Sequence, residues 1–291
     1  INISNYMITQ GEILYSYFQD EDNINGENCL VRGTVVKRPS KHVKSPYMAD
    51  VILDSDIDKQ DNNSNENDES NEILAHTPAL GCNGYVDKGQ SILLLKNKNQ
   101  KTKSSHKVEF AYDNENLVGT NPYLSNDIVG KMITEKKFPQ FADCNITNFK
   151  REKTVGNSRF DVYFEDGETK YYIEVKTAPV KDPTQNNAIF PKGYRKKKTD
   201  SFSPRAVKHL EELGKLAQDQ NNKCYLIYVV PRTDIDHFSP CKDDPIYCDA
   251  YLNAVKSGVS MISFCTTLDD EKRNIVFDRF LKIKFNWIKS K

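Results

Sequence analysis

The segment from Ser158 to Thr177, SRFDVYFEDGETKYYIEVKT, constrains the fold more than any other stretch of the chain. Two runs of β-branched and aromatic residues flank the turn at Asp166 to Thr169, which is typical of a β-hairpin. In the register that this turn sets, Asp161 lies directly opposite Glu174. Lys176 follows Glu174 by two positions, so its side chain leaves the strand on the same face.

Two opposed carboxylates in a partly buried hairpin are unfavourable unless positive charge lies between them. Such a pair destabilises the fold or forces one acid to bind a proton. A divalent cation removes the repulsion, and carboxylate ligands favour Mg²⁺ or Mn²⁺ over zinc. If a phosphodiester binds there, the cation polarises it and Lys176 orients a water or neutralises developing charge. The alternative is an ordinary hairpin in which Asp161 pairs with Arg159 or Lys176.

The first part of the chain is rich in short strands. Five or six apolar runs separated by polar, Gly or Pro residues predict a small β-barrel over residues 1–120. Two insertions interrupt it. The acidic segment 54–72 is too polar to bury surface and predicts a disordered loop. The segment 96–107 carries basic residues and no acid, which fits either a solvated loop or a finger that contacts phosphates.

The second part, residues 121–291, alternates helices and strands. Helices are predicted after a cap at Ser125 or Asn126, after Ser203 with Pro204 in the first turn, and after Asp244 with Pro245. The apolar run CYLIYVVP at 224–231 is typical of a strand covered on both faces. This order predicts an α/β sheet domain that contains the hairpin.

Charge, cysteine content and hydropathy exclude few functions. Lys and Arg together number 41, as do Asp and Glu, so a nucleic-acid partner has to be inferred from local patches. The seven cysteines show no zinc-site spacing and predict reduced thiols. No stretch resembles a signal peptide or a membrane span, which predicts a soluble, cytoplasmic or nuclear protein that is not secreted and binds no membrane.

Several blocks, in the same order over most of the chain, resemble the sugar fermentation stimulation protein A family: LVRGTVVKR, LVGTNPYLSNDIV, GNSRFDVYF, YYIEVKT, PRAVKHLEELGKLA and YLIYVVPRTDIDHFSP. The resemblance implies an α+β two-domain protein, with an N-terminal OB-type barrel, a restriction-endonuclease-like α/β domain, and DNA binding without clear sequence preference. In that superfamily the first-strand acid and the E-x-K of the second strand bind metal and catalyse. Those positions fall on Asp161, Glu174 and Lys176, with the two acids as metal ligands.

The chain also departs from the family pattern at three places. Pro231 precedes Arg232 where a glutamine is usual, and Lys192 follows Phe190–Pro191 where an aspartate is usual. The helix after Asn126 has Gly130 and Lys131 where an acid is usual. These differences bear on catalytic turnover more than on metal binding.

Basic residues in three places predict contacts with a nucleic-acid backbone. A loop cluster, Arg195, Lys196, Lys197 and Lys198, fits phosphate contacts, a solvated lysine loop or a nuclear-import signal. On the following helix the candidates are Arg205, Lys208 and His209. In the barrel they are Arg38, Lys41 and Lys44, near the aromatic ring of Tyr47.

The sequence therefore predicts a DNA-binding protein with a Mg²⁺- or Mn²⁺-dependent phosphodiesterase site. One alternative is a regulatory nucleic-acid-binding protein that keeps the nuclease fold and does not cleave. Another is a single-strand or RNA binder in which the barrel dominates.

Overall fold

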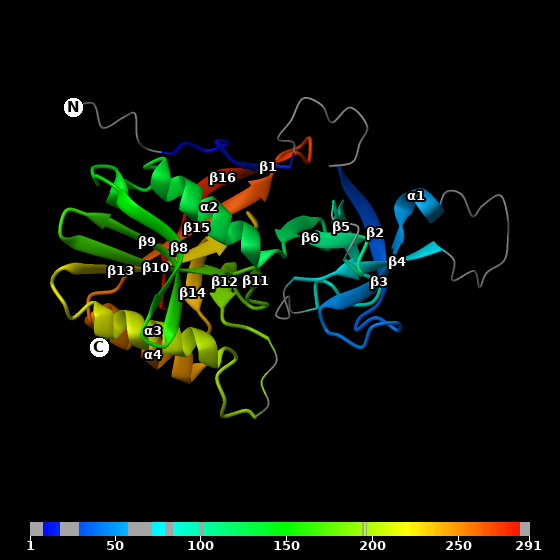
Figure 1. Cartoon of the computed structure of the whole chain (residues 1–291). Helices are drawn as coiled ribbons and strands as arrows, with labels where there is room; N and C mark the ends of the chain where they lie inside the picture. Colours follow the sequence, from blue (N-terminus) through cyan, green and yellow to red (C-terminus); the bar gives the residue numbers. More distant parts are fainter. Residues whose placement is uncertain are drawn as a thin grey trace. The chain divides into compact units, whose positions relative to one another are not determined.

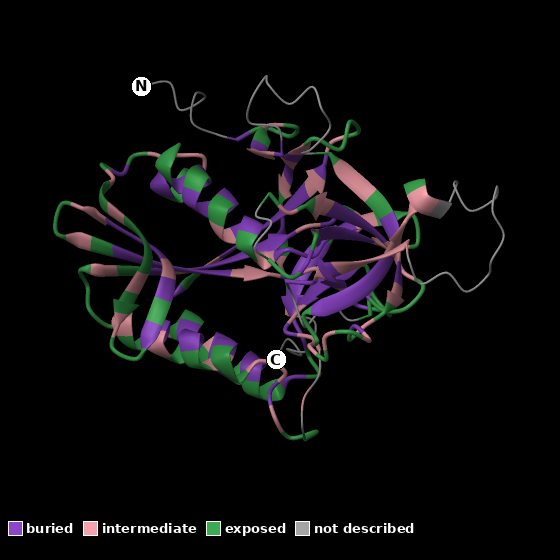
Figure 2. Cartoon of the chain, turned by 45° about the vertical axis from the view of Figure 1, so that its right-hand side comes forward, coloured by how far each residue is buried: buried purple, intermediate pink, exposed green. Residues whose placement is uncertain are grey.

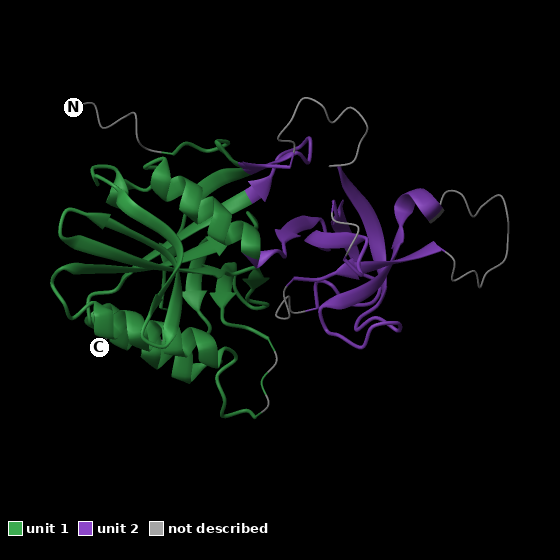
Figure 3. Ribbon diagram, in the orientation of Figure 1, with its two compact units in different colours: residues 1–14, 123–266, 276–291 green, residues 15–122, 267–275 purple. Residues whose placement is uncertain are grey.

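The computed structural model describes residues 8–17, 29–57, 71–78, 84–98, 102–193, 195 and 197–285 (Figure 1). The chain divides into two compact units (Figure 3). The α/β unit comprises Ile1–Leu14, Tyr123–Thr266 and Val276–Lys291, and the barrel unit comprises Tyr15–Pro122 and Thr267–Ile275. The division after Pro122 lies close to the predicted boundary at 120/121. The sequence did not predict that residues 1–14 belong to the α/β unit and residues 267–275 to the barrel unit. Pairing between distant parts of a chain leaves no local signal.

The barrel unit contains a closed five-stranded barrel of OB type. Its strands are β2 (Leu30–Lys37), β3 (Met48–Leu53), β4 (Glu72–His76), β5 (Ser91–Lys96) and β6 (His106–Asp113), with β7 (Asn116–Gly119) added to β6. They pair in the order β4-β3-β2-β5-β6, and parallel pairing of β4 with β6 closes the ring. Buried Val35, Val51, Ile92, Leu94 and Val108 fill its interior. The predicted barrel is confirmed.

The two predicted insertions are shorter than expected. The acidic segment begins with a short helix, α1 (Asp54–Ile57), and ends in β4, so its predicted loop character is wrong at both ends. Residues 58–70 lie outside the described part of the chain. In the basic segment, Lys96 belongs to β5, and His106 and Lys107 belong to β6. Residues 99–101 are likewise outside it.

The α/β unit is built on a seven-stranded sheet between two helical layers (Figure 1). The strand order is β1 (Ile13–Ser16), β16 (Asn274–Phe280), β15 (Ser260–Leu268), β13 (Asn222–Val230), β10 (Thr169–Thr177), β9 (Ser158–Asp166) and β8 (Thr147–Val155). Helix α2 (Pro122–Thr134) covers one face, and α3 (Pro204–Leu216) and α4 (Pro245–Lys256) cover the other. Strands β10, β13 and β15 run parallel, whereas β8, β9 and β10 run antiparallel.

A second, four-stranded sheet completes the α/β unit. It contains β11 (Val180–Lys181), β12 (Asn187–Phe190), β14 (His237–Pro240) and β17 (Lys282–Ile283) in that order. A short 3-10 turn, Pro139–Phe141, follows α2. The central strand β13 is buried over most of its length, as its apolar sequence predicted (Figure 2).

Local capping explains where the helices begin. The Ser203 side chain accepts from Ala206 N at the start of α3, and Asp244 accepts from Tyr247 N at the start of α4. Both predicted caps are confirmed. The predicted cap of α2 is wrong, because α2 already begins at Pro122, a residue suited to the first helical position. Ser125 and Asn126 therefore lie within the helix, where their side chains are available for other contacts.

The first strand, β1, falls within residues 1–120 that were assigned to the barrel, but it pairs outside the barrel. β1 lies at the edge of the seven-stranded sheet beside β16. Gly11 N donates to Phe277 O at 2.8 Å, and Phe277 N donates to Glu12 O at 2.9 Å. The start of the described chain thus adds a strand to the sheet that contains the hairpin.

Two further expectations concern the environment of the protein. Among the helices of the described residues, none is long and apolar enough to cross a bilayer. Cys29 is an exposed free thiol, and Cys144, Cys224, Cys241, Cys248 and Cys265 are buried free thiols.

Candidate functional site

The hairpin has the predicted register. Tyr171 pairs with Phe164 and Ile173 with Val162, and Gly167 takes the positive φ of +59° that the tight turn requires. Regular pairing of β9 with β10 ends at Val162. At the next position a side chain replaces the backbone as acceptor: Asp161 Oδ2 accepts from the Val175 backbone N at 2.8 Å. Asp161 and Glu174 therefore meet where the two strands stop pairing.

Asp161 is partly buried and is held from two directions. Asn126 of α2 donates its Nδ2 to Oδ1 at 2.8 Å, opposite the bond from Val175. Burial raises the pKa of Asp161 to about 6, and the negative charge of Glu174 adds to this rise. The two hydrogen bonds and the Lys176 ammonium offset it only in part. A nearby cation would relieve the same repulsion.

Glu174 is almost fully buried, and its side chain is 2% exposed. Its Oε1 contacts both Lys176 Nζ and His209 Nδ1. Burial alone would raise the pKa of Glu174, but the Lys176 charge and the His209 contact together lower it. Oε2 is buried without a hydrogen-bond partner among the described residues. An ionised carboxylate with one unsatisfied buried oxygen is costly, and a bound water or ion would remove this cost.

His209 lies in this carboxylate site rather than on the surface of α3. It is 5% exposed, and its ring centroid is 6.3 Å from that of Phe160. Its Nδ1 is also 3.5 Å from Lys176 Nζ. The sequence grouped His209 with Arg205 and Lys208 as a backbone contact, whereas the structure places it against Glu174 while the other two are exposed. On an amphipathic helix, the sequence alone does not show whether a histidine at the border of the apolar face is buried or exposed.

Helix α2 contributes two residues that were not predicted for the site. Asn126 binds Asp161, and Ser125 Oγ accepts from Thr177 Oγ1 at 2.7 Å, one position beyond Lys176. The available signal was Pro122, because a helix that begins there carries Ser125 and Asn126 in its first turns. The site thus draws on β9, β10, α2 and α3.

The predicted basic loop divides into paired and exposed residues. Arg195 donates to Asp243 O at 3.0 Å and stacks over the Phe202 ring at 4.4 Å, and Lys192 pairs with Asp243 at 2.7 Å. Lys197 and Lys198 are exposed. Lys196 lies outside the described residues.

On α3, Arg205 and Lys208 are exposed. Lys208 Nζ donates to Asn157 O at 2.7 Å, which joins the helix to the loop before β9. Arg205 and Lys208 thus lie on the exposed side of α3, the helix that carries the buried His209.

The predicted barrel cations are also partly engaged. Arg38 Nε donates to Pro46 O at 3.0 Å, whereas Lys44 is exposed and the Tyr47 ring is 41% exposed. Lys41 Nζ lies 3.1 Å from Glu72 Oε2. Lys44 and Tyr47 are therefore the exposed residues of this predicted group.

A second group with possible metal-binding atoms lies in the barrel unit. Ligand atoms of His42, Asp50 and Glu72 are all within 4.8 Å of one another. However, Asp50 already accepts from Ser40 Oγ at 2.5 Å and from Lys41 N at 2.7 Å. The Lys41 ammonium beside Glu72 supplies positive charge there. Glu72 Oε2 is buried without a hydrogen-bond donor among the described residues, as Glu174 Oε2 is, but the Glu72 side chain is 13% exposed and that of Glu174 is 2% exposed.

Arg232, at one of the departures from the family pattern, has a structural role. It is completely buried; its Nε donates to Asp234 Oδ1 at 2.7 Å, and its Nη1 donates to Pro179 O at 3.0 Å. These bonds hold the segment after β13 against the end of the hairpin strand.

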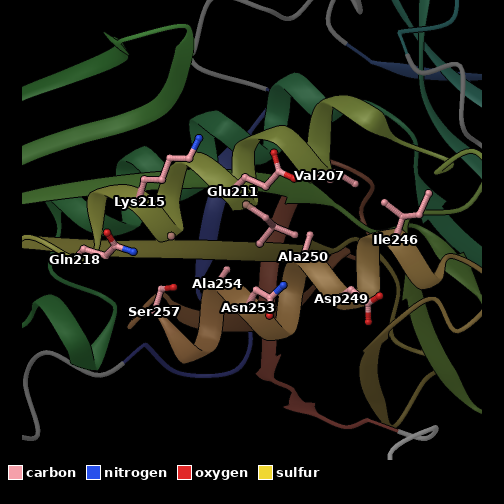
Figure 4. A pocket seen from close by; sticks show the side chains of 12 residues that line it. Val207, Glu211, Lys215, Gln218, Ile246, Asp249, Ala250, Asn253, Ala254 and Ser257 are labelled. Carbon is pink, nitrogen blue, oxygen red and sulfur yellow. The ribbon is translucent and has the colours of Figure 1, made fainter.

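A groove between α3 and α4 has a volume of about 460 Å³ (Figure 4). Its lining mixes apolar residues such as Val207 and Ile246 with polar ones such as Lys215 and Asp249. None of its lining residues belongs to the carboxylate site.

Comparison with known proteins identifies the family. The model described as "Sugar fermentation stimulation protein RE domain" matches residues 123–272. The sugar fermentation stimulation protein homolog of Desulfotalea psychrophila is 31% identical over 175 residues, covering 60% of this chain and 69% of that protein. The Clostridium novyi homolog is 27% identical over 247 residues, covering 84% and 93%.

Among solved structures, SfsA of Pyrococcus furiosus in complex with Ca²⁺ has a TM-score of 0.70 and 18% identity, with 93% of this chain and 100% of that chain covered. This likeness confirms the predicted fold class, an OB-type barrel followed by an α/β domain. The match across the second half of the chain confirms the predicted relationship. The chain belongs to the sugar fermentation stimulation protein family.

Proposed function

We propose that this chain is a DNA-binding protein with a divalent-cation-dependent phosphodiesterase site formed by Asp161, Glu174 and Lys176. One observation carries the proposal. Glu174 is kept ionised by Lys176 and His209 on Oε1, while its buried Oε2 has no partner among the described residues, and a second carboxylate lies next to it. The Glu174 Oε2 atom is therefore available to a cation.

The donor set fits a hard cation. Asp161 and Glu174 offer carboxylate oxygens, which suit Mg²⁺, Mn²⁺ or Ca²⁺ better than zinc. The Pyrococcus furiosus protein was solved with Ca²⁺, an ion of this class. Binding would also relieve the repulsion that raises the pKa of Asp161. Mg²⁺ and Mn²⁺ are the ions we propose for activity.

The protein's own residues would divide the work as follows. When bound, the cation supplies Lewis-acid polarisation of the phosphodiester. Asn126 and the Val175 backbone N hold Asp161, and His209 holds Glu174, so neither carboxylate has to reorganise. The Lys176 ammonium, next to Glu174, would stabilise negative charge that develops on the phosphoryl oxygens.

One observation favours a second candidate, a regulatory DNA-binding protein that does not cleave. Helix α2 has Gly130 and Lys131 where the resemblance leads us to expect an acid. The missing carboxylate would remove a cation ligand or a base while leaving the fold and the remaining site intact.

A cleavage assay separates the two candidates. Single-stranded and double-stranded DNA and RNA would be incubated with the protein in Mg²⁺, in Mn²⁺ and in EDTA. We expect metal-dependent cleavage by the wild type and none by a Glu174→Gln variant purified in parallel. Equal cleavage in both preparations would indicate a contaminating nuclease. DNA binding without cleavage in any metal would favour the regulatory candidate.

A further inference from the structure

We propose that Arg151 is a phosphate contact for a nucleic-acid strand bound at the carboxylate site. This inference rests on the proposed function and names a residue of the substrate-binding surface. Arg151 lies on β8, the strand at the edge of the seven-stranded sheet. It pairs with Val162, the neighbour of Asp161.

The guanidinium of Arg151 packs against Gly130 of α2. A Cβ added at Gly130 of α2 would lie 2.7 Å from Arg151 Nη1 and 3.3 Å from Cζ. On the same helix, Asp127 Oδ1 accepts from Arg151 Nη2 at 3.0 Å. The Asp127 carboxylate and the small residue at position 130 thus place the guanidinium beside α2.

Helix α2 links the Arg151 guanidinium to the carboxylate site. Asn126 donates to Asp161, and Gly130 follows Asn126 by one helical turn, so their Cα atoms are about 6 Å apart. Phosphates along one strand of DNA are spaced by about 3.4 Å along the helix axis. A strand with one phosphate at Asp161 and Glu174 would therefore place a phosphate one or two nucleotides away within reach of Arg151.

The exposure and the bonding of Arg151 fit an external ligand. Its side chain is 39% exposed, and that of Asp127 is 57% exposed. The bond to Asp127 uses one of five guanidinium donors, which leaves others for a phosphate. Such an exposed pair contributes little to stability. Neighbouring Lys150 on β8 is also exposed.

The test measures DNA affinity against salt concentration, using fluorescence anisotropy of labelled single-stranded and double-stranded DNA in Ca²⁺ buffer. The variants are Arg151→Ala, Arg151→Lys and Gly130→Ala, with Arg273→Ala as control. Arg273 is an exposed arginine that pairs with Glu271 at 3.5 Å, so its removal changes the net charge equally. Thermal melting checks that each variant is folded.

We expect Arg151→Ala to weaken binding roughly tenfold at low salt and to lower the log–log salt slope by about 0.7 to 0.9. Arg151→Lys should keep the slope and lose part of the affinity, because lysine cannot bind a phosphate with two parallel donors. Gly130→Ala should weaken binding in the same direction, since its methyl group displaces the guanidinium.

Two results would overturn the inference, and they differ in whether the proposed function fails as well. If the wild type binds DNA but Arg151→Ala has the same slope and affinity as Arg273→Ala, Arg151 makes no phosphate contact and the proposed function stands. If the wild type binds no nucleic acid in any buffer, both proposals fail.

Discussion

Each unit of the protein buries a glutamate whose neighbour at two positions along the strand is a lysine. In the barrel unit these are Lys107 and Glu109 on β6, and in the α/β unit they are Glu174 and Lys176 on β10. Both glutamates are 1% exposed. Nothing in these short patterns distinguishes them, yet the two carboxylates have opposite properties.

The difference lies in how the partners are distributed. Around Glu109, Lys107 Nζ lies 2.7 Å from Oε1, and Asn121 Nδ2 donates to Oε2 at 2.8 Å. Tyr17 OH also donates to Oε2, at 3.5 Å. Burial outweighs these contacts and raises the pKa of Glu109. Glu109 thus has an ammonium group beside one oxygen and hydrogen-bond donors on the other.

Around Glu174 the contacts with Lys176 and His209 both fall on Oε1, and the pKa is lowered despite burial. Its Oε2 has no partner within the described part of the chain. The comparison teaches that a buried acid becomes a candidate ligand when its charge is stabilised from one side and its other oxygen is left without a donor.

Glutamine substitutions should produce the largest contrast. We expect Glu174→Gln to lower Mn²⁺ and Mg²⁺ affinity by roughly 100-fold or more, because a neutral amide replaces a charged ligand. Asp161→Asn should act in the same way, with the fold intact. Glu109→Gln should leave metal affinity unchanged. Isothermal titration calorimetry measures all three, and unchanged affinity in both Glu174→Gln and Asp161→Asn would remove the proposed site.

Replacing Lys176 and Lys107 tests whether the first acts in catalysis and the second in stability. Lys176→Met should lower the cleavage rate on the order of 10²-fold with nearly unchanged metal and DNA affinity, because its charge acts in the transition state. Lys107→Met should leave cleavage unchanged and lower the free energy of unfolding by roughly 1–3 kcal/mol, since it removes a partner of a buried carboxyl group. Single-turnover kinetics and urea denaturation measure these effects. Equal rate losses in both variants would mean that the two lysines do not differ in role.

The pH dependence of stability should have opposite signs at the two glutamates. The raised pKa of Glu109 gives a contribution that is present below pH 4.5, its usual pKa, and is lost as pH rises through the folded value. The lowered pKa of Glu174 gives a contribution that is present above pH 4.5 and is lost as pH falls through the folded value.

Urea denaturation in EDTA at several pH values tests these signs. The stability difference between wild type and Glu109→Gln should fall with rising pH. The difference for Glu174→Gln should rise with pH. Neither slope should exceed about 1.4 kcal/mol per pH unit, the limit for one proton. The same sign in both variants would contradict the comparison.

The smallest expected effects concern the surface cations of the two units. Replacing Arg195, Lys196, Lys197 and Lys198 by alanine should weaken binding on all DNA sequences alike and lower the log–log salt slope by about 0.7 to 0.9 per lost phosphate contact. Arg195 already binds Asp243 O, so we expect a smaller change than four lost contacts would give. A barrel variant with alanine at Arg38, Lys41 and Lys44 tests the other predicted group of cations in the same way. An unaltered slope in the first variant would identify a solvated loop.

Local sequence predicted much of the fold. The turn at Gly167 set the hairpin register, and Ser203 and Asp244 marked the starts of α3 and α4. These features depend on residues a few positions apart. The pairing of β1 with β16 was missed because it joins segments at opposite ends of the chain, and no residue in either strand encodes its partner.

The sequence predicted the hairpin residues of the site but not their partners on the helices. Asp161, Glu174 and Lys176 share one hairpin, so strand geometry alone brings them together. Asn126 and His209 come from helices on opposite faces of the sheet, and only their packing onto it brings each to its carboxylate.

By itself, the sequence determined which charged residues the hairpin brings near one another, because the positions of side chains along paired strands depend on turn and register. Only the tertiary structure decided what those charges can do. Burial, the neighbours supplied by α2 and α3, and the lack of a donor to Oε2 among the described residues set the ionisation and availability of Glu174. They do so because electrostatic free energies depend on distances and solvent exposure, which are properties of the packed molecule and of no single segment.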